Sequence, residues 1–362
     1  MVLQQNETYG NLIAPNGSEG KAIPALYRDI QDGKVSFAAD GDPPGLVPQR
    51  VQIGVSKIGQ ESRNGVGAVI VKGEPELVLD IPRKDSIITE TPEMPKPKIT
   101  AQLKNYGGGL VRFGWILNVK WITPQTNPTR FVSDVFHATT EARGSSTSEL
   151  NLSWDNKIRG GDQISLYVIA FAEGKSYQAE LHDPFKIVGK NPTVAAVKDG
   201  LSPEEQVVVY MESSPKWKHF SSQPGYPIFG KPHGYGLMQI DNPQATDEEI
   251  WNWMANKIAG KNLLAAKRSD AQGYASRIRR KAQVGDLDPG FLKVLDFDSD
   301  ELLWKETFQR YNGGGNWYWQ PDDADDPESV GEWMQKTNTS GYGIKAWNVL
   351  QSIQAGNPPT GW

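Results

Sequence analysis

The chain contains no cysteine, no long apolar run and no excess of positive charge, and each absence excludes a class of structure or function. Without cysteine there is no disulfide framework, no thiolate metal site and no cysteine nucleophile. No stretch approaches the roughly 18 apolar residues of a spanning helix, so no membrane span is expected. The 38 basic and 43 acidic residues give a net charge of -5, which argues against nucleic acid as the main partner.

The remaining composition describes a globular chain of more than one domain. Its 362 residues are 38% hydrophobic and 22% charged, which fits two or three domains. The opening MVLQQNETYGNL has neither the basic nor the apolar segment of a secretory signal. Either a signal has been removed from this sequence, or the protein, made in the cytoplasm, reaches its substrate by another route.

Residues 1–95 are rich in glycine and proline and predict a small β-rich domain. Short β-like runs are separated by turn clusters such as GDPPG and ESRNG. The runs are Val51–Ile58, Gly67–Lys72 and Leu77–Ile81. The three prolines of Thr91–Lys98 predict a semi-rigid linker after this domain.

Residues 96–190 carry the clearest strand signal. Large apolar residues occupy every second position from Val111 to Trp121, which places them on one face of a strand. A second alternation runs through Leu150, Leu152 and Trp154, and the apolar run from Ile164 to Ala172 follows. Strands at this spacing without a helical pattern predict an immunoglobulin-like sandwich.

Residues 191–362 change to a helical period and predict a mainly α domain. Ser202–Glu205 is a capping box that should open a helix ending near Glu212. Thr246–Glu249 is a second capping box. The apolar positions expected on later helices are Ile250, Met254 and Ile258, then Trp304, Phe308 and Tyr311, with a last helix over 344–353.

Glu212 is a candidate general acid because of what precedes it. The run VVVYM gives its helix a strongly apolar face, and a carboxyl held against apolar surface has its pKa raised. A proton donor working near neutral pH needs such a shift. The competing interpretation is an ordinary solvated carboxylate at a helix end.

Three segments together resemble the goose-type lysozyme and soluble lytic transglycosylase superfamily. They are YMESSP around Glu212, GYGLMQID over Gly234–Asp241, and RYNGG over Arg310–Gly314. The resemblance covers residues 195–355 and implies a lysozyme-like fold that cleaves the β-1,4 bond between N-acetylmuramic acid and N-acetylglucosamine. The whole chain is then expected to hold all-β modules followed by a lysozyme-like domain at 191–362.

The resemblance also implies a role for each matched residue. Glu212 matches the acid/base glutamate of the family, and Asp241 matches one of two aspartates that position a water in goose-type lysozymes. The residues implied to line the substrate site are Ser213, Gly236, Leu237, Met238, Gln239, Tyr311 and Asn312. For Leu237 and Met238, core packing is an open alternative, and for Asp241 an Asx-type turn in DNP is another.

One departure leaves the reaction outcome open. No acidic residue lies between Glu212 and Asp241, and Lys231 stands in the segment where the first family aspartate would fall. Most glycosidases use two carboxyls, whereas transglycosylases of this superfamily use one and form an anhydro-sugar. The sequence therefore leaves hydrolysis and transglycosylation both open.

No metal or cofactor is expected. DFDSDE over Asp296–Glu301 is similar to the start of a calcium loop, but its sixth residue is Glu301 rather than glycine. An acidic turn that caps the next helix explains it better. His219 and His233 do not have the spacing of metal ligands.

The expected partner is the peptidoglycan glycan strand, at the cell wall or periplasm, with the wall of a target cell as one option. A phage lysin or an injected toxin fits a wall enzyme without a secretory signal, and an injected toxin would require a cognate immunity protein. The alternatives are a non-catalytic glycan-binding or tail-structural protein that keeps the fold, and a chitin-directed glycosidase.

Overall fold

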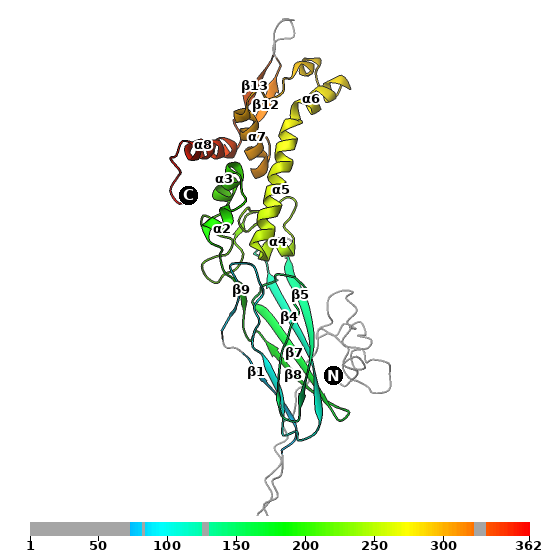
Figure 1. Cartoon of the computed structure of the whole chain (residues 1–362). Coiled ribbons are helices and arrows are strands. Elements are labelled where there is room, and N and C mark those ends of the chain that lie inside the picture. Colours follow the sequence, from blue (N-terminus) through cyan, green and yellow to red (C-terminus); the bar gives the residue numbers. More distant parts are fainter. Residues whose placement is uncertain (1–72, 82–83, 125–129, 322–330) are drawn as a thin grey trace, which may run out of the picture. The chain divides into compact units, whose positions relative to one another are not determined.

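The computed structural model describes residues 73–81, 84–124, 130–321 and 331–362, which form two compact units (Figure 1). The first, called the β unit, holds the described residues up to Val188 apart from Thr89–Pro92 and Pro124. The second, called the helical unit, holds Gly189–Trp362 and those two short segments. The chain is therefore a multidomain protein of mixed strand and helix. No helix in the described ranges has the length and apolar character needed to cross a bilayer.

The β unit is built from antiparallel sheets. One sheet has the order β5-β4-β7-β8, another the order β1-β3-β6, and β2 pairs with β9. The strands are β1 (Glu76–Asp80), β2 (Ser86–Ile88), β3 (Thr100–Lys104), β4 (Leu110–Ile122), β5 (Phe131–Arg143), β6 (Thr147–Glu149), β7 (Gln163–Ala172), β8 (Lys175–His182) and β9 (Ile187–Gly189).

The alternation in β4 explains the core of this unit. Every second residue from Val111 to Trp121 is at most 3% exposed, so one face of the strand is buried. β4 pairs with β5 and β7 on its two sides, with Trp115 opposite Ala138 and Val168. The strands predicted at 111–121 and 164–172 are confirmed, and so is β1 within Leu77–Ile81.

The expected boundary near residue 95 does not match the strand pairing. β1 pairs with β3, and β2 pairs with β9, so both strands before residue 95 contribute to the sheets of the β unit. The linker predicted over Thr91–Lys98 is wrong for its second half, because Pro95 accepts a hydrogen bond from Trp154 Nε1 at 2.9 Å. Ile99, directly after it, has no exposed surface.

Two other strand predictions have different outcomes. The alternation through Leu150, Leu152 and Trp154 does not form a strand, because β6 ends at Glu149 and irregular backbone follows. Leu150 is nevertheless buried, which is why the segment has an apolar pattern. The runs predicted at Val51–Ile58 and Gly67–Lys72 lie outside the described residues.

The helical unit places α7 between α5 and α8, while α3 packs against α8 (Figure 1). Its helices are α2 (Val194–Lys198), α3 (Pro203–Glu212), α4 (Asp247–Trp251), α5 (Trp253–Gln272), α6 (Tyr274–Gln283), η1 (Pro289–Lys293), α7 (Asp300–Asn312) and α8 (Tyr342–Gln354). Two hairpins complete it, β10 (Phe229–Gly230) with β11 (Gly234–Tyr235), and β12 (Trp317–Gln320) with β13 (Glu332–Gln335).

Helix starts follow the capping residues of the sequence. Ser202 and Thr246 both form capping boxes, with Glu205 and Glu249 as the reciprocal partners. Ser299 caps α7 at the acidic turn that resembles a calcium loop, so this turn begins a helix as expected.

The helix predicted from Thr246 is wrong in its length and its face. It stops at Trp251, and Asn252 then caps α5 by accepting from the N–H groups of Met254 and Ala255. An Asn side chain that satisfies two such donors favours a new helix start over continuation. Met254 and Ile258 are consequently 41% and 55% exposed rather than buried.

Candidate functional site

Glu212 is the last residue of α3, and the turn after it is tightly fixed. Val207, Val208 and Val209 have no exposed surface and anchor the helix in the core. Ser213 Oγ donates to Val209 O at 2.6 Å and accepts from the N–H of Trp217 at 2.8 Å. These bonds end the helix at the candidate acid and hold its backbone in one place.

Burial raises the pKa of the Glu212 carboxyl above its ordinary value, although Tyr342, Asn312 and Lys216 each act to lower it. Glu212 Oε1 is buried and has no hydrogen-bond partner among the described residues. A buried acceptor without a partner is costly, so such atoms call for an explanation. One explanation is that the Glu212 carboxyl is protonated and donates its hydrogen to a bound ligand.

Two tyrosines lie beside this carboxyl. Burial, and then the Glu212 charge, raise the pKa of both Tyr311 and Tyr342, so both phenols stay neutral and keep their hydrogens. Tyr311 donates to Met238 O at 2.7 Å. The Tyr342 hydroxyl is buried beside Glu212 but closes no hydrogen bond of its own among the described residues. The site therefore contains an unsatisfied carboxyl oxygen and an unsatisfied phenol.

Asn312 ends α7 next to Tyr311 and is exposed. Its Oδ1 accepts from Ser340 Oγ at 3.2 Å, which leaves its amide hydrogens for the carboxyl of Glu212 or for a ligand. The structure thus brings together Glu212, Tyr311 and Asn312 from α3 and α7, as the sequence predicts.

His219 and Asn256 hold the GYGLM segment in place from inside the core. His219 Nε2 lies 2.8 Å from Ile250 O, so this nitrogen carries the hydrogen, and Nδ1 accepts from the N–H of Leu237 at 3.2 Å. Asn256 accepts from the N–H of Met238 at 3.0 Å and donates to Tyr235 O at 2.9 Å. Burial lowers the pKa of His219 to about 4, so the ring is neutral.

Gly236 has to be glycine at this point. Its φ is +75°, and a Cβ would lie 2.3 Å from His219 Cε1. The absence of a side chain at Gly236 allows its backbone to pack closely against the His219 ring, and Gly236 is buried. A direct contact between Gly236 and a substrate does not fit this burial.

Three other residues expected to contact substrate are also inside the core. Ser213, Leu237 and Met238 are 0% exposed, so their expected ligand contacts are wrong in this conformation. The alternative of core packing holds for Leu237 and Met238. Met238 still contributes through its carbonyl, which accepts from Tyr311.

Gln239 and Asp241 remain partly exposed. Gln239 Nε2 donates to Gly236 O at 2.7 Å, and its Oε1 lies against the β10–β11 hairpin, where a Cβ on Gly230 would be 2.1 Å from it. Asp241 makes no side-chain hydrogen bond or ion pair within the described part of the chain, and the Asx-type turn considered for DNP is therefore not formed. No contact joins Asp241 to Glu212.

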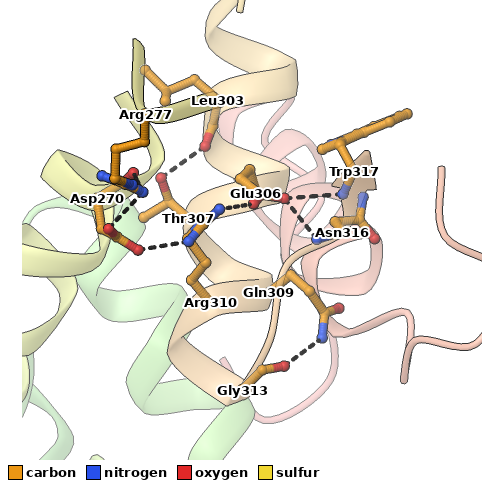
Figure 2. A network of polar contacts seen from close by, with 10 residues as sticks. All are labelled: Asp270, Arg277, Leu303, Glu306, Thr307, Gln309, Arg310, Gly313, Asn316 and Trp317. Atoms are coloured by element: carbon orange, nitrogen blue, oxygen red, sulfur yellow. Dashed lines mark hydrogen bonds and ion pairs between the residues drawn. The ribbon is translucent and has the colours of Figure 1, made fainter. Parts of the chain in front are cut away.

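A buried ionic network supports the loop that follows Asn312 (Figure 2). Glu306 on α7 is 0% exposed and accepts from the backbone N–H of Asn316 at 2.6 Å and of Trp317 at 3.1 Å. Arg310 pairs with Glu306 at 2.7 Å and with Asp270 at 2.6 Å. Gly313 and Gly314 adopt positive φ angles in this loop, and Glu306 fixes its far end at Asn316 and Trp317.

The described residues contain no group of three or more His, Asp or Glu side chains that would hold a metal ion. Independently of any metal, the site offers one carboxyl for proton transfer, with the Tyr342 phenol and the Asn312 amide beside it.

Comparisons with models of protein families, with curated proteins and with solved structures found no match to this chain.

Sequence reasoning missed four residues that shape the site: Asn256, Gln309, Glu306 and Tyr342. Each acts through contacts with other segments of the chain rather than through a repeating pattern. For Tyr342, the sequence offered one signal, because this tyrosine stands just before the helix expected over 344–353. The other three have none, because a polar residue inside a helix usually lies on the solvent side.

Proposed function

We propose that the helical unit is a lysozyme-like glycosidase that cleaves the β-1,4 bond between N-acetylmuramic acid and N-acetylglucosamine in peptidoglycan, with Glu212 as the proton donor. The proposal includes an immunoglobulin-like sandwich for the β unit and a lysozyme-like fold for the helical unit. The observation that carries it is the Glu212 carboxyl, which is buried beside two neutral tyrosines with its Oε1 unsatisfied.

A glycosidic oxygen must receive a proton as its bond to the sugar carbon breaks. A carboxyl with a raised pKa retains that proton at a pH where an ordinary glutamate has lost it. After bond cleavage the Glu212 carboxylate accepts a proton from the attacking hydroxyl, either of water or of the sugar itself. The Tyr342 phenol and the Asn312 amide then stabilise the negative charge of Glu212 by donating hydrogens to it.

The test is cleavage of purified peptidoglycan, with products identified by mass spectrometry. Glu212→Gln should reduce cleavage at least about a hundredfold because the amide cannot donate the proton. Glu204→Gln is the matched control, because Glu204 is a partly exposed glutamate in the first turn of the same helix and its side chain has no hydrogen bond or ion pair within the described residues, so it should retain wild-type activity. Glu212→Gln that retains more than about a tenth of the activity would exclude Glu212 as the acid.

The same experiment separates the alternatives. Reducing ends indicate hydrolysis and anhydro ends indicate transglycosylation. Wild-type protein that sediments with cell walls yet releases no product would identify a glycan-binding protein. Faster cleavage of chitin oligosaccharides than of peptidoglycan would identify a chitin-directed enzyme.

A further inference from the structure

The junction between α7 and α8 contains a buried glutamine that contacts three separate segments. Gln309 is 2% exposed. Its Oε1 accepts from the N–H of Gly343 at 3.2 Å, and its Nε2 lies 3.3 Å from both Gly313 O and Ser340 Oγ. One side chain on α7 therefore joins the start of α8, the turn before α8 and the loop after Asn312.

These contacts replace a cap that α8 lacks. Its N-cap residue is Gly341, which has no side chain to satisfy the first N–H groups of the helix. Ser340 Oγ accepts from the N–H of Tyr342 at 3.3 Å, and Gln309 accepts from the next N–H. The first turn of α8 is thus held by a residue of α7.

The backbones of the two helices also meet at this point. A Cβ on Gly343 would lie 2.1 Å from Lys305 O, so only glycine permits the approach. Tyr342 precedes Gly343, and Asn312 is joined to the same turn through Ser340. Tyr342 and Asn312 both lie beside Glu212, and each lowers the pKa of its carboxyl.

We propose that Gln309 is a positioning residue that fixes the start of α8 and the end of α7 against each other, and thereby sets the positions of Tyr342 and Asn312 beside Glu212. Gln309 itself does not contact the carboxyl. It acts by holding the two donors in a fixed relation from opposite sides of the α7–α8 junction.

The decisive variant is Gln309→Met, which keeps the length of the side chain and removes its three polar contacts. Thr307→Val is the matched control, because Thr307 is 0% exposed on the same helix and its hydroxyl donates only to Leu303 O within α7. Both variants lose buried polar contacts on α7, but only Gln309→Met releases α8.

The first readout is the titration of the Glu212 carboxyl by carbon NMR in the full chain, and it does not depend on any activity. Tyr342, Asn312 and Lys216 lower the pKa of Glu212, and Tyr311 is the other titratable group beside it. Releasing two of these donors should raise the midpoint by about half a pH unit in Gln309→Met. Thr307→Val should leave the midpoint unchanged.

The second readout is kinetic and rests on the proposed function. Gln309→Met should lower kcat about tenfold with KM within about twofold, because misplaced donors weaken stabilisation of the transition state more than substrate binding. Wild-type protein without glycosidase activity would contradict the proposed function while leaving the titration to decide the role of Gln309.

An unshifted Glu212 titration in a folded Gln309→Met protein would overturn the inference. If Gln309→Met does not fold, Ser340→Ala tests the same junction, because Ser340 is exposed and donates to Asn312. Ser340→Ala should raise the titration midpoint of Glu212 by less than Gln309→Met does. An unchanged midpoint in Ser340→Ala would again overturn the inference.

Discussion

The two units differ in where they bury polar side chains. The buried polar residues of the β unit are Thr123, Ser148 and Arg159, and each has a partner in its own sheets or in the adjoining loop. In the helical unit the corresponding residues are Ser213, His219, Asn256, Glu306, Thr307, Gln309 and Asn316. Most of these join separate segments of chain around the candidate acid.

This difference separates two ways of stabilising a fold. The β unit is stabilised by an alternating apolar face, which any sequence of the right pattern and volume provides. The helical unit accepts buried polar groups, whose desolvation costs free energy unless every partner is placed correctly. Such groups fix the position of particular backbone atoms, and a site for proton transfer needs that precision.

The largest expected effect tests the β unit. Trp115→Ala should destabilise this unit by about 4 kcal/mol, because it empties a fully packed position and removes the Nε1 hydrogen bond to Thr140. Calorimetry should show a lower midpoint temperature for the unfolding of the β unit and an unchanged midpoint temperature for the helical unit. Ile122→Ala is the control, since Ile122 lies on the same strand and is 41% exposed. Loss of both transitions in Trp115→Ala would show that the units fold as one.

The next effect tests the ionic network of the helical unit. Glu306→Ala should destabilise it by about 3 kcal/mol, because the guanidinium of Arg310 and two backbone N–H groups lose a buried partner. Glu301→Ala is the matched control on the same helix, where an exposed glutamate pairs with Lys305. Its cost should stay below about 0.5 kcal/mol. Urea unfolding that shows equal costs for the two variants would remove the distinction between the buried and the exposed pair.

The sequence predicted elements with a periodic or a local signal and missed those held by single distant contacts. The period of two in β4 and the capping boxes at Ser202 and Thr246 are local, and they correctly predicted one strand and the starts of two helices. The break at Asn252 was missed because the apolar spacing continues through it. The available signal for this break was Asn252 itself, because asparagine is a preferred N-cap residue and here stands inside a helical apolar pattern.

The candidate site divides in the same way. The segments of Glu212, Tyr311 and Asn312 could be identified from the sequence, and their side chains do meet. The sequence could not predict which of the other matched residues are exposed. Leu237 and Gln239 lie only two positions apart in one turn, yet Leu237 is buried and Gln239 is partly exposed. That difference depends on His219 and Asn256, which bind the turn from distant segments.

A pH titration of stability sharpens the comparison further. The pKa of His219 is lowered from 6.5 to about 4, so the unfolded chain binds a proton that the folded chain does not. His219 therefore contributes stability that is fully present above pH 6.5 and is lost as the pH falls toward 4. Between pH 7 and pH 5 the helical unit should lose about 2 kcal/mol through this residue.

Denaturant unfolding at the two pH values measures this loss. His219→Gln retains a donor for Ile250 O but does not titrate, so its pH dependence over this range should be about 2 kcal/mol smaller than that of wild type. Its stability at pH 7 should also be lower, because Leu237 loses its acceptor. Equal pH dependence in both proteins would mean that His219 is protonated in the folded state.

Asp241→Asn is expected to have the smallest effect on stability, below about 0.5 kcal/mol. Its carboxylate has no hydrogen bond or ion pair within the described residues, so the substitution removes no contact that stabilises the fold. Asp298→Asn is the control and should be equally neutral, because the Asp298 carboxylate is exposed and also has no hydrogen bond or ion pair within the described residues.

A change in the products of peptidoglycan cleavage is then attributable to chemistry rather than to folding. If Asp241 positions a water, Asp241→Asn should lower the yield of reducing ends several-fold and spare the anhydro ends, because only the hydrolytic branch needs that water. Total cleavage should stay within about tenfold of wild type, in contrast to the loss expected for Glu212→Gln. An unchanged product ratio would remove Asp241 from the reaction. A loss as complete as that of Glu212→Gln, at unchanged stability, would mean that two carboxylates are required and that the single unsatisfied acid on α3 is not sufficient.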